Sequence, residues 1–111
     1  MQILHASIPA DRPKHVAETI AEILQGEAMP FPPAGPDGWM AWAGDGSIEL
    51  EIVPRGHVLH HDELEAAWRP VPDAERLSEV HLAIGVDLPA KEILTIAHKA
   101  SWPARLCSRG N

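Results

Sequence analysis

A strand-and-helix segment near the start of the chain recurs near its end, and this repeat limits the possible folds more than any other feature. Placing His5 on His81, an offset of 76 residues, brings further identical residues into register. They are Ile8 with Ile84, Asp11 with Asp87, Pro13 with Pro89, Ile20 with Ile96 and Ala21 with Ala97. The matches fall where a strand is expected to pass into a helix, so we interpret the repeat as a duplicated strand–helix unit.

The first copy of the unit is predicted from two different periodicities. Residues 3–8 alternate as a strand, with Leu4, Ala6 and Ile8 on one face and His5 on the other. Pro9 is expected to end this strand, and a helix is predicted over residues 13–24. Its buried stripe consists of Val16, Ile20, Ile23 and Leu24, and Gly26 is the expected stop.

Three more strands are predicted before residue 54. The first covers Glu27–Phe31, and the other two, Trp39–Ala43 and Ser47–Val53, form a hairpin around a Gly-Asp-Gly turn. In the last strand Ile48, Leu50 and Ile52 share one face, whereas Glu49 and Glu51 share the other. Trp39 and Trp42 lie on opposite faces of their strand, so one is expected to pack against a helix. The first 54 residues therefore predict a β-α-β-β-β order.

The second half of the chain is less regular. Residues 57–78 are interpreted as a charged, proline-containing connector, in which Trp68 is expected to dock against the body. The histidines of this connector, His57, His60 and His61, are interpreted as solvated. A strand over 79–86, a helix to about residue 100 and a further strand starting at Pro103 are predicted to follow.

Composition excludes several classes of function. The 111 residues are 45% apolar and carry a net charge of −7, which fits one acidic globular domain and argues against nucleic acid or an anionic membrane as partner. No apolar run is long enough to span a membrane, and no signal peptide is evident. The single cysteine, Cys107, forms no internal disulfide, so a cytoplasmic location is expected.

The order of these elements resembles the vicinal oxygen chelate superfamily, which includes glyoxalases, bleomycin resistance proteins and extradiol dioxygenases. The resemblance is carried by His5 in the first strand, by Ile48-Glu49-Leu50-Glu51 in the fourth, and by the repeat at His81. It implies an α+β fold in which paired βαβββ modules form a partly open barrel around a cup. Residues 1–56 would be the first module, 57–78 the connector and 79–111 part of the second, within a single domain.

The resemblance also implies a site. His5, Glu49 and His81 would bind a divalent metal (Fe, Mn, Zn or Ni), with Glu51 as the alternative carboxylate and both glutamates as catalytic candidates. Trp39 or Trp42 would line the cup as a wall for substrate. The implied function is that of a metal-dependent lyase, isomerase or dioxygenase acting on a small oxygenated metabolite, and the implied assembly is a homodimer.

Two alternatives stay open at this stage. The first is a protein without metal that sequesters a small apolar or aromatic compound in the same cup; a blander one is an accessory domain without a ligand. The 76-residue offset would close the second module near residue 130, beyond Asn111. A chain that continues further, a partner subunit that completes the sheet, or a naturally reduced member would each explain this difference.

Overall fold

The computed structural model describes residues 2–61, 66–71 and 82–106 of the 111-residue chain. The first half contains β1 (His5–Ala10), α1 (Pro13–Ile23), β2 (Glu27–Pro30), the short 3-10 helix η1 (Pro32–Ala34), β3 (Trp39–Trp42) and β4 (Glu49–Pro54). The second half contains β5 (His57–His61), β6 (Ala66–Pro70) and α2 (Ala90–Lys99). The predicted β-α-β-β-β start and the α+β class are confirmed.

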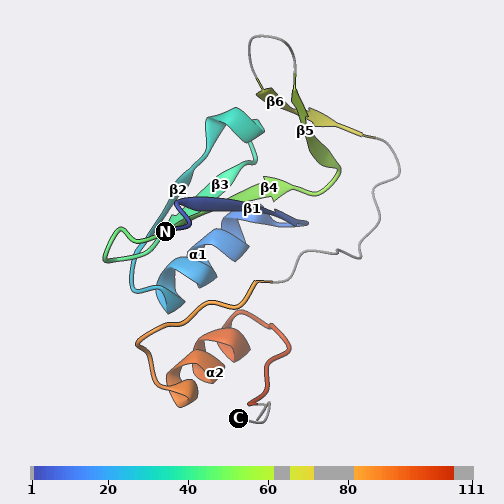
Figure 1. The fold of residues 1–111 in the computed structure, drawn as a ribbon. Helices are drawn as coiled ribbons and strands as arrows, with labels where there is room; N and C mark the ends of the chain where they lie inside the picture. Colours follow the sequence, from blue (N-terminus) through green and yellow to red (C-terminus); the bar gives the residue numbers. More distant parts are fainter. Residues whose placement is uncertain (1, 62–65, 72–81, 107–111) are drawn as a thin grey trace.

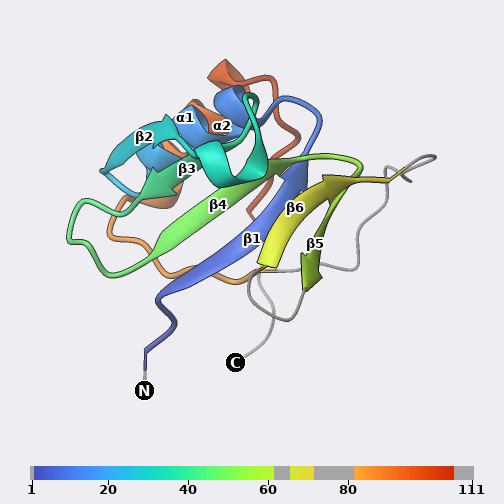
Figure 2. The ribbon, with the colours of Figure 1, turned by 90° about the horizontal axis from the view of Figure 1, so that it is seen from above.

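The first four strands form one mixed sheet in the order β1-β4-β3-β2. β1 pairs with β4 in parallel, whereas β3 is antiparallel to both of its neighbours. β5 and β6 form a separate antiparallel hairpin. Figure 2 shows β1 and β4 side by side and pointing the same way. Among the described residues the sheet does not close into a barrel.

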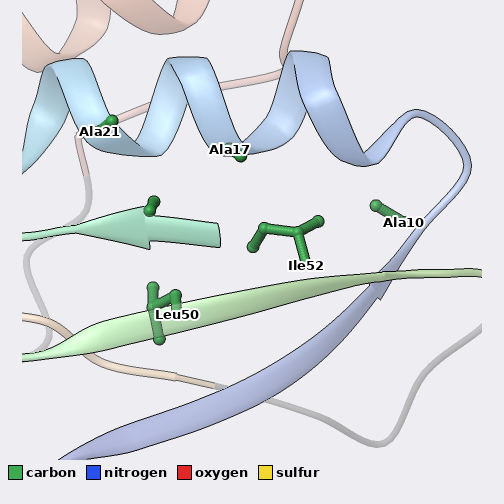
Figure 3. Close-up of a cluster of buried hydrophobic side chains, with 6 residues drawn as sticks. Ala10, Ala17, Ala21, Leu50 and Ile52 are labelled. Atoms are coloured by element: carbon green, nitrogen blue, oxygen red, sulfur yellow. The ribbon is translucent and has the colours of Figure 1, made fainter. Parts of the chain in front are cut away.

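The helices cover one face of this sheet. Figure 1 shows α1 directly against the sheet, α2 beyond α1, and the β5–β6 hairpin on the opposite side. The core between α1 and the sheet is built from the buried residues shown in Figure 3: Ala10, Ala17, Ala21, Ala41, Leu50 and Ile52. Alanines supply most of this list, so the helix backbone approaches the strands closely and two large side chains fill the space between them.

The pairing of the strands fixes which side chains face the helices. Ala6 lies opposite Leu50 and Ile8 lies opposite Ile52, and all four belong to or pack against the core. His5 lies opposite Glu49 and so points to the other face of the sheet. The predicted separation of aliphatic and polar faces in β1 and β4 is therefore confirmed.

The end of α1 is joined to the β3–β4 turn by backbone contact. The amide of Gly44 donates a hydrogen bond to the carbonyl of Leu24 at 3.1 Å. The amide of Gly26 donates one to the carbonyl of Ala21 at 2.8 Å. The left-handed residue that ends the helix is Gln25, with φ 52°, rather than the predicted stop Gly26. Gly26 is needed for a different reason, because a Cβ there would lie 1.8 Å from the Trp42 carbonyl oxygen.

α2 is held against α1 by polar contacts. His15 Nε2 lies 2.9 Å from the carbonyl oxygen of Ala100, and its ring meets that of Trp102 edge-on with centroids 6.3 Å apart. Lys99 Nζ lies 2.7 Å from a carboxylate oxygen of Glu22. His15 is half-buried because it joins the two helices.

Four sequence predictions are corrected. Pro9 lies inside β1 rather than ending it, which is tolerated because β1 is at the edge of the described sheet and its outer side meets no described strand that needs an amide donor. Residues 57–71 contain the β5–β6 hairpin, which the interpretation of 57–78 as a connector did not include. The described residues of the two later predicted strands, 82–86 and 103–106, are not in strands. The remaining residues of those two strands lie outside the described part.

No helix in the described part of the chain is long and apolar enough to cross a membrane. The division into two modules and a connector stays a prediction.

Candidate functional site

The face of the sheet opposite α1 gathers most of the predicted site residues. Side chains that are paired across strands point to the same face, so the register defines two rows. The first row runs His5, Glu49, Trp42, Glu27, and the second runs Ser7, Glu51, Met40, Met29. We call these eight residues the uncovered face, because neither α1 nor α2 packs against this side of the sheet. It combines two methionines and a tryptophan with three carboxylates and one histidine.

The predicted ligands His5 and Glu49 are direct neighbours on this face. Parallel pairing of β1 with β4 places them opposite each other, and the charge of His5 lowers the pKa of Glu49. Glu51 has a different partner, because its carboxylate accepts a hydrogen bond from the hydroxyl of Ser7. Of the two candidate carboxylates, Glu49 is therefore the one that faces the histidine.

The pKa of Glu49 is raised overall. The main cause is partial burial, which disfavours the charged carboxylate; the charge of Glu51 two residues away adds to it, and His5 opposes it. The side chain is half-buried on a face shared with two other carboxylates. A positive charge bound beside Glu49 would favour its ionised form and oppose this rise.

This shift predicts a dependence of stability on pH. Because the folded pKa of Glu49 lies above its unfolded value, ionisation of Glu49 as the pH rises through the folded pKa lowers the free energy of unfolding. Glu49→Gln should raise the urea midpoint at pH 7, and this gain should vanish below the ordinary value of 4.5. The exposed variant Glu18→Gln is the control and should show no gain. An equal gain at both pH values would contradict the assignment.

The two tryptophans of β3 lie on opposite faces, as predicted. Trp39 is on the helix side, where the Lys14 ammonium sits 5.2 Å from its ring centroid. Trp42 is on the uncovered face, 36% exposed, and its indole N–H donates to the sulfur of Met40 at 3.1 Å. Of the two predicted substrate-binding tryptophans, Trp42 alone therefore shares a face with His5 and Glu49.

A groove adjoins Trp42 at the β2 side of this face. It is lined by Gln25, Gly26, Glu27, Met29, Trp42, Ala43, Gly44 and Gly46. The close approach of α1 to the β3–β4 turn at Gly26 and Gly44 forms one wall of it. The sequence alone did not indicate Ser7, Met40 or Glu27 as site residues, because each is placed beside the others only by the register of the strands.

The full metal set is not assembled within the described residues. Over 2–61, 66–71 and 82–106, no three histidine, cysteine, aspartate or glutamate side chains are arranged to hold a metal ion. His81 lies outside the described part, so the set His5, Glu49 and His81 stays a prediction. The chemistry of the two placed donors, one imidazole and one carboxylate, suits the predicted metals.

The two histidines of β5 whose side chains the structure describes, His57 and His60, do not form a competing cluster. Alternation along β5 places His57 and His60 on opposite faces, and His57 Nδ1 lies 3.1 Å from the carbonyl oxygen of Pro54. His57 is therefore tied to its own strand end.

Comparison with models of protein families, with curated proteins and with solved structures gave no match. What is shown is a small α+β fold, consisting of a mixed four-stranded sheet and a β-hairpin.

Proposed function

We propose that this protein is a glyoxalase-like, metal-dependent enzyme that acts on a small oxygenated metabolite at the uncovered face. The observation that carries the proposal is the pairing of His5 with Glu49 across the parallel β1–β4 ladder. Parallel pairing brings together residues 44 positions apart on a rigid element, which is how a sheet positions two ligands of one metal ion. His81 of the repeated strand is the third proposed ligand.

The electrostatics of the face support a bound cation. Glu27, Glu49 and Glu51 stand on it, and the partial burial of Glu49 beside Glu51 raises the pKa of Glu49. A divalent ion bound by Glu49 and His5 would offset the repulsion between the carboxylates of Glu49 and Glu51. When bound, it would supply Lewis-acid stabilisation to a substrate with two adjacent oxygens. Glu51, hydrogen-bonded to Ser7, is the carboxylate left to hold or move a proton.

Metal content tests the proposal. Purified protein is equilibrated with Fe(II), Mn(II), Zn(II) or Ni(II), passed over a desalting column and assayed by mass spectrometry. We expect close to one ion per chain, and a loss of at least about tenfold in affinity in His5→Ala, in Glu49→Gln and in His81→Ala. His98→Ala, on the exposed side of α2, is the matched control and should bind as wild type. Absence of metal from the wild type, or equal binding by His5→Ala, overturns the proposal.

A second candidate is a binding protein without metal, and the groove beside Trp42 favours it. An indole, Met29 and glycine backbone form a partly apolar hollow that suits a small aromatic or apolar compound. This candidate predicts ligand binding that is unchanged by a chelator and by His5→Ala but is lost in Trp42→Leu.

A further inference from the structure

We propose a second site on the same molecule, for an organic cation such as an alkylated ammonium, centred on Trp42 between Glu27 and Glu49. This goes beyond the proposed function, because it needs neither a metal ion nor His81. The decisive geometry is the register of three strands. Trp42 on β3 is paired directly with Glu27 on one side and with Glu49 on the other.

The aromatic ring is fixed and accessible. The hydrogen bond from the Trp42 indole to Met40, two residues earlier on β3, holds the ring along its own strand. Trp42 is still 36% exposed, and it is one of the residues that line the groove between the end of α1, β2 and the β3–β4 turn. An indole face is the best of the aromatic side chains for attracting a cation, and a fixed ring loses little entropy on binding.

The charges around the ring select the sign of the ligand. The two neighbours paired with Trp42 are both glutamates, and Glu51 stands one step further along β4. His5, the neighbour of Glu49, is the one basic group in the two rows, and those rows carry no lysine or arginine. The field at the ring is therefore negative, in a chain whose net charge is −7.

The same features select an organic cation over a bare metal ion. A metal ion is satisfied by oxygen and imidazole donors and gains little from an indole or from Met29 at the groove wall. An alkylated ammonium is weakly hydrated, presents methyl groups to Trp42 and Met29, and keeps its charge within reach of two carboxylates. The structure thus assigns the groove beside Trp42 to the organic cation and the part of the face around His5 to the metal ion. Glu49 lies between Trp42 and His5.

Choline and its uncharged carbon isostere, dimethylbutanol, are the probes for this site. Each compound is titrated into the protein in the presence of a chelator, and binding is followed by calorimetry and by tryptophan fluorescence. We expect saturable binding of choline, and binding of the isostere weaker by about three- to thirtyfold, the range that one cation–π contact supplies. Equal binding of the two probes, or no saturable binding of choline at millimolar concentration, overturns the inference.

Substitutions test whether choline binds at the Trp42 ring and the neighbouring carboxylates. Trp42→Leu should abolish choline binding, whereas Trp42→Phe, which keeps a ring, should retain part of it. Glu27→Gln should weaken it severalfold, and Glu18→Gln, on the exposed side of α1, should not. Circular dichroism confirms that each variant is folded. Binding that survives in folded Trp42→Leu contradicts the proposal.

The outcome is separable from the metal test. Glu27→Gln is expected to lose choline affinity and keep its metal, whereas His5→Ala is expected to lose metal and keep choline binding in the chelator. Choline binding that is unchanged in Glu27→Gln removes the cation site. Metal binding that is unchanged in His5→Ala removes the metal proposal.

Discussion

Leu50→Ala should lower the free energy of unfolding by about 3 to 5 kcal/mol, the largest loss we expect from truncating a core side chain. Leu50 is 1% exposed at the centre of the sheet. Its cross-strand neighbours are Ala6 on β1 and Ala41 on β3, and Ala17 and Ala21 of α1 belong to the same core. None of these alanines can extend into the space that the leucine leaves, so the cavity stays open. Urea unfolding followed by circular dichroism measures the loss.

Two comparisons sharpen this prediction. Ile52→Ala should cost less, because its neighbours Ile8 and Trp39 are large enough to relax toward the gap. Leu82→Ala removes the same atoms from a side chain that is 43% exposed, and its effect should stay within about 0.5 kcal/mol. A cost for Leu50→Ala no greater than that for Leu82→Ala would show that α1 does not pack on the sheet as described.

Gly26→Ala is the second change with a large expected effect, of about 3 kcal/mol or more. The added Cβ would lie 1.8 Å from the carbonyl oxygen of Trp42 and 2.8 Å from the amide nitrogen of Gly44. Both are backbone atoms, so the clash is relieved only if the end of α1 moves away from β3. That movement breaks the hydrogen bond from Gly44 to Leu24 and opens the groove beside Trp42.

The control for Gly26→Ala is Gly85→Ala. Gly85 has no atom within 4 Å of a new Cβ and no positive φ, so its substitution should be neutral or slightly stabilising. Gly26→Ala should also weaken choline binding, because the shape of the groove and the stability of the fold both depend on the close approach of Gly26 to the backbone of Trp42. A Gly26→Ala protein as stable as the wild type would contradict the close approach of α1 to β3.

The sequence predicted the first module well because its signals are local. The alternation around Leu50 and Ile52, the helical spacing after Pro13 and the Gly-Asp-Gly turn each specify one element without reference to the rest of the chain. The faces of β1 and β4 followed from the same alternation. The helical half of the repeat is also confirmed, since α2 covers Ala90–Lys99.

What the sequence did not predict depends on partners distant along the chain. Val58 and Leu59 did not indicate a strand among the histidines and charges around them, because β5 exists only through its pairing with β6. Residues 82–86 alternate like β1, yet an alternating segment becomes a strand only where another backbone offers its hydrogen bonds. The site shows the same division. The residue types His5, Glu49 and Trp42 were evident, whereas the alignment of Trp42 between two glutamates required the register.

The central claim is that the uncovered face holds the metal ion at His5 and Glu49. The most direct measurement is a titration of the protein with paramagnetic Mn(II), followed by the broadening of assigned backbone amide signals in nuclear magnetic resonance spectra. Broadening falls off steeply with distance from the ion, so it maps the site. We predict that the signals of residues 5–7 and 49–51 broaden first, before those of residues 57–61. Broadening that starts at the β5 histidines, or that spreads evenly over the acidic surface, would contradict the account.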